Sequence, residues 1–464
     1  MPAFHTVRPE KHFGVFLPEM LRPLIDPVIA AFINEQTHTL SALIEQYGSP
    51  LNVVWPHAFD INAKALQAVL KQQGVRHALF YGAKANKSQS LLQAAADAGI
   101  GVDVSSIHEL QAALRAGTPA TQICATGPAK TAVFHEALVS TGALICVDSC
   151  EELEHLKTVI EQRAAPVKSR LLLRYRPKSC PKSRFGMGAE DVLECLQSLV
   201  RQPDIFQFEG FHFHLGGYGF ESRAQALREV TGFVDAAREM GLNPQMIDIG
   251  GGLPIRYVDP HAYELYLRNE NTPGHFYTQA VPEAYYPYGS ELTAPHWLSL
   301  LLEADHSPGL SIANYLKRES ITLALEPGRS LVDQAAISLF RVTRTKKLAH
   351  DNTVVFVEGS SFSACETWFA SEYLVDPVLI STHARTPIPT QAFIAGHSCL
   401  DDDVITHRLI NFGSAPQPGD VLIYVNTAGY QMDLLENEFH RHPLPLRLTA
   451  TCCTEGNYTF SPDY

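Results

Sequence analysis

Residues that can take part in covalent and acid–base chemistry follow several short apolar runs of this chain. Lys84 follows "ALFYGA", His214 ends "FEGFHFH", and Glu326 follows "ITLAL". A lysine partly removed from water can form a Schiff base, and an imidazole can stack on a flat ring. A carboxylate can keep a pyridine nitrogen protonated. These three side chains together suit an aromatic cofactor that carries an aldehyde.

A glycine triplet and an arginine complete the set. Gly250, Gly251 and Gly252 follow the run "MIDI", and Arg329 stands three residues after Glu326. Backbone N–H groups of such a triplet can approach a phosphate closely, and an arginine can add a charge-assisted hydrogen bond. An aldimine lysine, a partner for the pyridine nitrogen and a phosphate cup are what pyridoxal 5'-phosphate requires. The sequence therefore predicts a site for this cofactor.

Each of these residues also has another interpretation. Lys84 alone would be a solvated lysine at a strand end, and the glycine triplet alone a feature of tight strand–helix packing. His212 and His214 could be two metal ligands, but metal-dependent barrels tend to carry such a pair on the first strand, and here it falls on the sixth run. The joint presence of all the elements favours the cofactor, with no metal.

A fold that collects these residues needs their apolar runs to lie side by side. Eight β-branched or aromatic runs alternate with helix-like stretches such as "SLLQAAADAG" and "EELEHLKTVIEQ". Eight strand–helix units predict an α/β fold built on a (β/α)8 TIM-like barrel, whose site lies at the C-terminal ends of the strands. The runs span residues 78–83, 100–104, 122–126, 143–148, 170–175, 208–214, 246–250 and 321–325.

The remaining segments predict a second domain. After about residue 340 the chain changes to β-like runs such as "TVVFVEG" and "DVLIYVN", which predict a C-terminal β-sandwich or β-barrel domain. We assign residues 38–56 and 341–464 to this domain and 57–340 to the barrel. Residues 254–298, aromatic and proline-containing, are predicted to be an insertion over the barrel mouth. Residues 1–37 form an N-terminal extension that the sequence does not place.

The composition describes a globular protein that needs more than one core. The chain has 464 residues, of which 45% are hydrophobic and 18% charged, and its net charge of -13 argues against nucleic acid as a partner. The apolar runs are too short to span a membrane, and no signal peptide is evident. The nine cysteines include no CxxC pair, so neither a zinc site nor a disulfide framework is predicted. A cytoplasmic location is expected.

Four motifs resemble those of a known family. "YGAKAN", "FHFHLGG", "DIGGGLP" and "EPGRSL" are similar, in the same order, to the marks of the diaminopimelate/ornithine/arginine decarboxylase family, the fold type III pyridoxal-phosphate enzymes with an alanine-racemase-like barrel. The resemblance spans roughly residues 40–440. It implies a barrel with a C-terminal β domain, a homodimer, and Lys84 as the aldimine lysine. It also implies that Asp103 and Arg174 line the site.

Two motifs of the β domain extend the resemblance. "GHSCLDDD" resembles the family's cysteine motif, which implies that Cys399 is a proton donor in the partner subunit's site. "NTAGY" resembles the glycine–tyrosine motif, which implies that Tyr430 lies near the phosphate and ring. Each active site would therefore be shared between two chains. "KSRFGM" (182–187) resembles the family's mobile loop, which we interpret as a lid that excludes water.

Departures from the family pattern bear on the substrate. Leu400 stands where the family usually has an acidic residue that contacts the far end of the substrate, whereas Asp403 keeps the spacing of the second acid. The arginine-containing element that binds the distal carboxylate of diaminopimelate should fall near 361–373, which has no arginine. Gly217 replaces a frequent serine. These changes indicate a divergent branch, closer to the siderophore-associated decarboxylases.

The sequence thus predicts a decarboxylase of an amino acid such as diaminopimelate, ornithine, lysine or a siderophore-type conjugate. Lys84 would form the aldimine, carbon dioxide would leave, and Cys399 would return a proton. An amino-acid racemase on the related barrel is one alternative, which "EPGR" disfavours because such racemases pair the pyridine nitrogen with arginine. A non-catalytic, pyridoxal-phosphate-binding or regulatory homologue is the other, which Leu400 leaves open.

Overall fold

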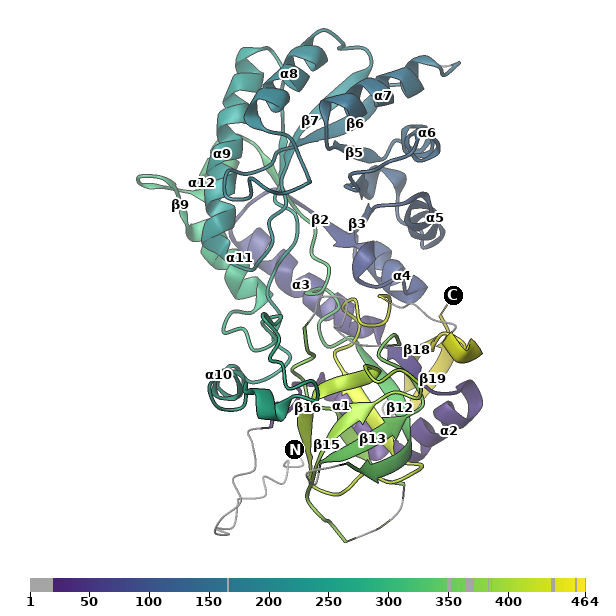
Figure 1. Cartoon of the computed structure of the whole chain (residues 1–464). Helices are drawn as coiled ribbons and strands as arrows, with labels where there is room; N and C mark the ends of the chain where they lie inside the picture. The colour runs from purple at the N-terminus through teal and green to yellow at the C-terminus, as the bar shows by residue number, and fades with distance from the viewer. Residues whose placement is uncertain are drawn as a thin grey trace.

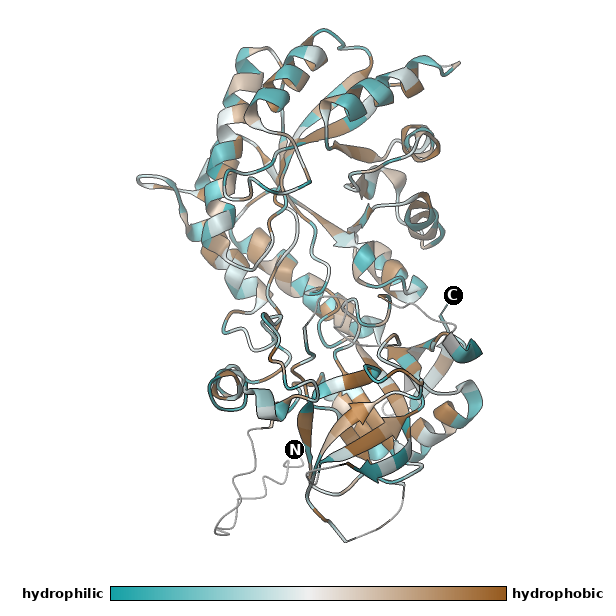
Figure 2. Ribbon diagram, viewed as in Figure 1, coloured by the Kyte–Doolittle hydropathy of each residue, from teal (hydrophilic) through white to brown (hydrophobic). Residues whose placement is uncertain are grey.

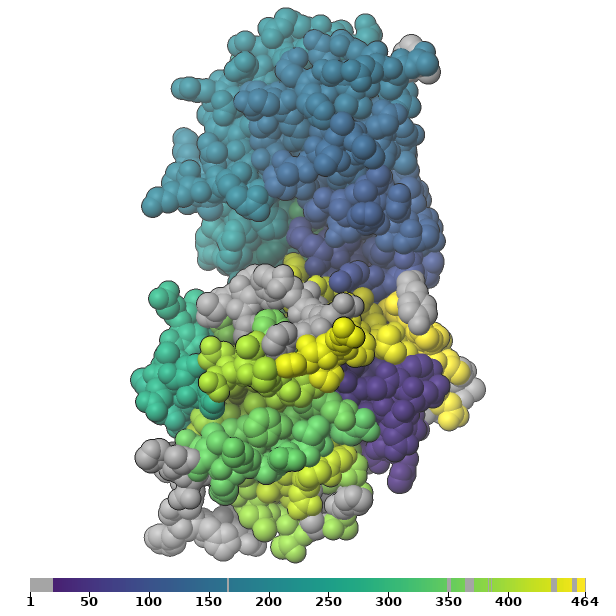
Figure 3. Space-filling view, turned by 45° about the vertical axis from the view of Figure 1, so that its right-hand side comes forward, coloured from purple at the N-terminus to yellow at the C-terminus, as the bar shows by residue number. Residues whose placement is uncertain are grey.

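Two lobes make up the protein. The computed structural model describes residues 20–164, 167–348, 352–363, 371–382, 384, 386–434, 439–454 and 457–463. The barrel forms one lobe and a mainly stranded domain the other, and a narrower waist joins them (Figures 1 and 3). This arrangement confirms the predicted fold class of a (β/α)8 barrel with a C-terminal β domain.

The barrel closes through eight parallel strands in the order β11-β2-β3-β4-β5-β6-β7-β8. All eight predicted runs become strands, and most of their residues are buried because a closed parallel sheet is covered on both faces. β11, the last in sequence, completes the ring by pairing with both β2 and β8. The strands are β2 (His77–Gly82), β3 (Gly101–Val104), β4 (Ile123–Ala125), β5 (Leu144–Val147), β6 (Ser169–Arg174), β7 (Phe206–His212), β8 (Met246–Asp248) and β11 (Thr322–Leu325).

Helices surround the barrel with their apolar faces turned inward and their polar faces outward (Figure 2). Several begin directly at a serine or threonine N-cap, which ends the preceding loop sharply: Ser88, Ser106, Thr131 and Ser149 each accept a backbone N–H three residues further on. The helices are α3 (Pro56–Gln72), α4 (Gln89–Asp97), α5 (Ile107–Arg115), α6 (Ala132–Thr141), α7 (Cys150–Glu161), α8 (Ala189–Val200), α9 (Phe220–Glu239), α11 (Ala294–Glu303) and α12 (Ile312–Arg318). A short hairpin, β9 (Asp305–Ser307) and β10 (Leu310–Ser311), precedes α12.

The second lobe is one nine-stranded sheet. β1, which precedes the barrel in sequence, lies antiparallel to β12 and parallel to β18, so the chain starts in this sheet, forms the barrel and returns. Ile337, Leu339 and Val425 belong to its buried core. The strands are β1 (Leu51–Val54), β12 (Ala336–Lys347), β13 (Thr353–Val357), β14 (Val378–Ile380), β15 (Thr390–Ala395), β16 (Val404–Phe412), β17 (Val421–Val425), β18 (Leu446–Thr454) and β19 (Asn457–Pro462).

Two segments that lie outside the regular βα pattern pack against this sheet. α1 (Pro27–Glu35), from the extension that the sequence left unplaced, buries Phe32 against Trp55 at a ring-centre distance of 5.6 Å. α2 (Thr37–Tyr47) follows it, almost wholly within the segment assigned to the β domain. α10 (Pro260–Asn269) lies beside the same domain in Figure 1, and Tyr257, Tyr266 and Tyr288 of the predicted insertion enter the domain's core. The insertion thus links the barrel to the sheet. Among the described residues, no helix has both the length and the hydrophobicity needed to cross a lipid bilayer.

Gly210 in β7 offers a test of the barrel geometry. Its φ is +149°, and a Cβ there would lie 1.9 Å from the carbonyl oxygen of Met246 on β8. We expect Gly210→Ala to lower the free energy of unfolding by about 3 kcal/mol or more, measured by urea denaturation. Gly232→Ala in α9 is the control, because no atom lies within 4 Å of its new Cβ apart from its chain neighbours and the backbone of its own helix; it should stabilise by up to about 1 kcal/mol. Equal stabilities of the two variants would contradict this geometry.

Candidate active site

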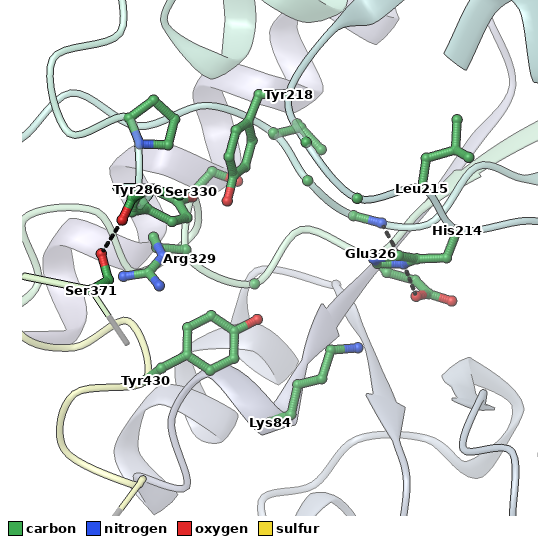
Figure 4. Close-up of a pocket in the computed structure, with 18 of the residues that line it drawn as sticks. Lys84, His214, Leu215, Tyr218, Tyr286, Glu326, Arg329, Ser330, Ser371 and Tyr430 are labelled. Carbon is green, nitrogen blue, oxygen red and sulfur yellow. Dashed lines mark hydrogen bonds and ion pairs between the residues drawn. The ribbon is translucent and has the colours of Figure 1, made fainter. Parts of the chain in front are cut away.

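A cavity of about 450 Å³ opens where the C-terminal ends of the barrel strands meet the β domain (Figure 4). Barrel loops supply one wall, the segment 284–287 of the insertion another, and the segment around Tyr430 a third. The lining residues are Lys84, His214, Leu215, Gly216, Gly217, Tyr218, Gly251, Gly252, Leu253, Ala284, Tyr285, Tyr286, Pro287, Glu326, Gly328, Arg329, Ser330, Ser371 and Tyr430.

Lys84 extends into this cavity between Tyr430 and Glu326 (Figure 4). A short 3-10 turn, Ala83–Ala85, follows β2 and carries the lysine, whose Nζ lies 3.0 Å from Asp103 Oδ2 at the end of β3. Thr126 donates to the other oxygen of Asp103 at 2.5 Å. Burial opposes the charge on Lys84, but the carboxylates of Asp103 and Glu326 outweigh it and raise the pKa of the lysine. The amine is therefore held as an ammonium ion at a fixed place.

Glu326 lies at the floor of the cavity, between two histidines. His212 Nε2 lies 3.0 Å from Glu326 Oε1, and His214 Nδ1 lies 3.7 Å from Oε2. Burial opposes ionisation of Glu326, but its interactions with His212, His214 and Lys84 outweigh it, so the pKa of Glu326 lies well below its ordinary value. Burial lowers the pKa of His212, so this imidazole is neutral and donates its Nε2–H to the carboxylate.

Asp248, at the end of the neighbouring strand β8, is in the opposite state. Burial and the charge of Glu326 raise the pKa of Asp248 well above its ordinary value, which keeps this carboxyl group protonated. Its Oδ1 accepts a hydrogen bond from the N–H of Gly250 at 2.8 Å. One polar atom from each of His212, Asp248 and Glu326 lies within 4.8 Å of the others. The buried floor thus presents a single negative charge, on Glu326.

The glycine triplet forms a wall without side chains. A Cβ on Gly250 would lie 2.5 Å from His214 Nδ1, and a Cβ on Gly251 would lie 2.6 Å from the carbonyl oxygen of Glu326. Gly250 and Gly252 also have φ values of +69° and +81°, a region that other residues rarely adopt. Side chains are therefore excluded at these positions, and Gly251 and Gly252 line the cavity with backbone alone.

Arg223 holds this wall from behind, and the sequence reasoning missed it. Its guanidinium, fully buried in α9, donates to the carbonyl oxygens of Leu215, Gly217 and Gly251 at 2.8, 2.8 and 3.2 Å. Burial lowers the pKa of Arg223 to about 10. The two glycine-rich loops are thus fixed to each other by one cation. A signal was present, because an arginine in the first turn of a helix directly after "HLGGYGF" is otherwise unfavourable next to the helix dipole.

Arg329 lies between two tyrosines at the other end of the cavity. Its guanidinium carbon is 4.0 Å from the ring centre of Tyr286 and 4.9 Å from that of Tyr430, and it donates to the carbonyl oxygen of Gly429 at 2.9 Å. Tyr286 comes from the insertion, whose role the sequence left open. The edge of Tyr218 packs on Tyr286 at a ring-centre distance of 4.9 Å. The insertion therefore fixes the position of the arginine.

Arg174 reaches the same region from β6. It lies 3.3 Å from Asp148 Oδ1, donates to the carbonyl oxygen of Thr126 at 3.1 Å, and packs over the ring of Phe185. Through Thr126 it is linked to Asp103 and so to Lys84. Phe185 belongs to the predicted lid, and Arg184 covers its ring at 4.0 Å. The structure thus joins Lys84, Asp103, Arg174 and the lid in one contact chain.

The residues of the cysteine motif lie apart from this cavity. Cys399 and Leu400 are exposed in the segment between β15 and β16, and neither is among the described residues that line the cavity. Asp403 is buried, and its two oxygens accept the N–H groups of Ser361 and Ser398 at 2.6 and 2.9 Å. Residues 364–370 of the expected distal-carboxylate element lie outside the described part of the chain.

Comparisons with known proteins match this geometry to one family. Residues 60–274 match the model of the pyridoxal-dependent decarboxylase pyridoxal-binding domain. An uncharacterized protein, y4yA of Sinorhizobium fredii, is 50% identical over 445 residues, 96% of each chain. The diaminopimelate decarboxylase of Zymomonas mobilis is 24% identical over 423 residues, 87% of this chain and 88% of that protein. The chain belongs to the pyridoxal-dependent decarboxylases.

Solved structures show the same fold. Diaminopimelate decarboxylase from M. jannaschii in complex with L-lysine has a TM-score of 0.69, with 21% identity over 88% of this chain and 89% of that one. Lysine/ornithine decarboxylase from Vibrio vulnificus in complex with putrescine has a TM-score of 0.66, with 20% identity over 89% and 98%. This decarboxylase-family chain therefore shares the fold over nearly its whole length.

Pyridoxal 5'-phosphate is the cofactor of this decarboxylase family, and the cavity fits it. Gly251 and Gly252 line the cavity with backbone alone, and Arg329 supplies a cation in the same lining. Glu326 is an ionised carboxylate in the floor, and Lys84 is an amine that reaches the same space. An anion-binding backbone, a carboxylate and a lysine are the chemical groups that this cofactor needs.

Tyr286 should strengthen cofactor binding through Arg329. Tyr286→Ala removes the ring that covers the Arg329 guanidinium, so it should weaken binding of pyridoxal 5'-phosphate about tenfold. Tyr286→Phe keeps the ring and should bind the cofactor as wild type does. Titration of the apoprotein, followed by the cofactor's visible absorbance, measures both dissociation constants. Pyridoxal, which lacks the phosphate, should bind wild type and Tyr286→Ala equally. Tyr277→Ala, at an exposed position of the same insertion, is the control. If Tyr286→Ala lost as much affinity for pyridoxal as for pyridoxal 5'-phosphate, a role through the phosphate would be refuted.

Proposed function

We propose that this protein is a decarboxylase of an amino acid. The observation that carries the proposal is the placement of Lys84 and ionised Glu326 in one cavity, with a buried imidazole behind the carboxylate. Pyridoxal 5'-phosphate, when bound, accepts the electron pair left on the α-carbon as carbon dioxide departs. Belonging to the pyridoxal-dependent decarboxylases supports this chemistry over that of a racemase.

Glu326 and its neighbours would hold the pyridine nitrogen in its protonated state. The carboxylate is ionised at neutral pH, and its fixed negative charge favours a proton on the nitrogen that faces it. His212 holds the carboxylate in orientation, and His214 lies at the edge of the cavity where it would stack on the ring. Protonated Asp248 adds no second charge that would compete for the proton.

The phosphate would lie against the glycine triplet and Arg329. Gly252, Arg329 and Tyr430 all line the cavity, and the N–H of Gly251 donates to His214 Nδ1 at 3.3 Å. Lys84 would bind the carbonyl carbon at the other end, and Asp103 positions its amine. The same amine would later release the product amine. Phe185 and Arg184 would cover the reacting α-carbon and keep water away from it.

The substrate would be an amino acid whose far end is not a simple ammonium group. Leu400 is apolar and 45% exposed, and Asp403 already accepts a backbone N–H at each oxygen. Relatives carry the names of diaminopimelate and lysine/ornithine decarboxylases. A conjugate of the siderophore type, in which the distal amine is acylated, would suit Leu400 best because it needs no acid there. Carbon dioxide release from ornithine, lysine, arginine, diaminopimelate and carboxylated diamine conjugates would distinguish these substrates.

Lys84 provides the direct test of the chemistry. Lys84→Ala should lower carbon dioxide release by about a thousandfold or more, because no other lysine lines the cavity among the described residues. Borohydride treatment with the cofactor should add one cofactor mass to wild type and none to the variant, as mass spectrometry would show. Lys87→Ala, an exposed lysine three residues away, should behave as wild type. A variant that released carbon dioxide at the wild-type rate would refute the proposal.

A homodimer with shared active sites would account for Cys399. The thiol is exposed in its own chain, where a partner subunit could receive it as the donor of a proton to the α-carbon. An equal mixture of inactive Lys84→Ala and Cys399→Ala subunits, unfolded and refolded together, should regain about a quarter of wild-type activity. Half of the dimers would be mixed, and each would hold one intact site. No recovery in mixtures that sedimentation shows to be dimeric would contradict shared sites.

A further inference from the structure

Three sulfur atoms meet on the outer side of the barrel, near the ends of β5 and β6. Cys150 opens α7, Cys195 lies in α8, and Met187 precedes α8. The Sγ atoms of the two cysteines are 3.4 Å apart, and Met187 Sδ lies 3.6 Å from Cys195 Sγ. α7 and α8 are neighbours in the outer ring (Figure 1). We call these three residues the sulfur cluster.

The sulfur cluster has a closed side and an open side. Cys195 and Met187 are buried, with 1% and 3% of their surface exposed, whereas Cys150 is half-buried. A small ion could therefore enter past Cys150 and reach the two inner sulfurs without any opening of the barrel. Neither thiol takes part in a disulfide.

We propose that the sulfur cluster is a binding site for one cuprous ion. Two thiolates and a thioether are the soft donors that select Cu(I) over harder divalent ions. Three sulfurs at about 2.3 Å from one ion stand roughly 4 Å apart, so the observed separations need to open by only about half an ångström. Binding forms two Cu–S bonds to thiolates and one to the thioether. The two S–H protons leave to solvent, and no electron is transferred.

The site is mechanically connected to the active site. Met187 donates its N–H to the carbonyl oxygen of Arg174 and accepts the N–H of Arg176, at 2.9 and 2.8 Å. Cys150 follows Asp148 by two residues, and Asp148 pairs with Arg174. A cuprous ion would therefore tie the end of the lid to α7 beside this ion pair.

Competition for Cu(I) tests the site in the holoenzyme. The bicinchoninate complex of Cu(I), titrated anaerobically with protein, should lose its absorbance to one equivalent of wild type. Affinity should fall about tenfold or more in Cys150→Ser and in Met187→Leu, which keeps the volume of the side chain but removes the donor. Cys180→Ser, a half-buried cysteine of the neighbouring loop outside the sulfur cluster, is the matched control and should bind as wild type. Unchanged cofactor absorbance and melting temperature would show that each variant is folded.

A second readout separates this site from the other thiols. X-ray absorption of the one-to-one complex should show sulfur neighbours alone, and added Cu(I) should raise the melting temperature of wild type but not of Cys150→Ser. The proposal is overturned if Cys150→Ser competes as well as wild type, or if Cys399→Ser alone abolishes binding. It is also overturned if wild type takes no copper from the chelator, or if nitrogen neighbours appear.

Discussion

The buried carboxylate of Glu326 is the constraint on which the rest of the site depends. An ionised carboxyl group is unfavourable in a protein interior unless other groups compensate for the charge. Here Glu326 accepts a hydrogen bond from neutral His212 on β7, lies 3.7 Å from His214 just beyond that strand, and is stabilised by the charge of Lys84. Asp248, on the strand β8 between β7 and β11, is protonated because burial and the charge of Glu326 raise its pKa. The charge of Glu326 thus governs the polar side chains at the ends of three neighbouring strands, β7, β8 and β11.

Closure of the barrel makes this arrangement possible. β11 must pair with both β8 and β2, and this pairing brings Glu326 to Lys84 across 242 positions of sequence. Gly210 and the glycine triplet permit the close approach of neighbouring backbones. The β domain then covers the opening: Tyr430 donates its N–H to the carbonyl oxygen of Ala85, and Asn86 donates to that of Ala428. The turn that carries Lys84 is therefore held from both lobes.

The three cationic side chains around the cavity, Arg223, Arg329 and Lys84, are each stabilised by a different kind of neighbour. Arg223 donates to four carbonyl oxygens and has no acidic partner among its described hydrogen bonds, so it acts as a link between loops. Arg329 is covered by aromatic rings, which leave one end of the cavity positively charged. Lys84 lies against a carboxylate, which keeps it charged and oriented. These surroundings include neighbours from other elements of the fold, such as Tyr286 beside Arg329 and Asp103 beside Lys84.

The sequence by itself determined the eight strands, their order along the chain and the side chains at their ends, because period, glycine placement and motif spacing are local properties. Lys84, His214, Gly251, Gly252, Glu326, Arg329 and Tyr430 could be named from it, and they line one cavity. Only the tertiary structure decided which carboxyl groups are ionised. Glu326 is ionised and Asp248 is neutral because of burial and of partners from other strands. The tertiary structure also decided that the insertion fixes Arg329 through Tyr286, that Arg223 links two loops, and that three distant sulfurs meet. Each of these contacts joins different elements of the fold, so the type of the residue alone does not specify its partner.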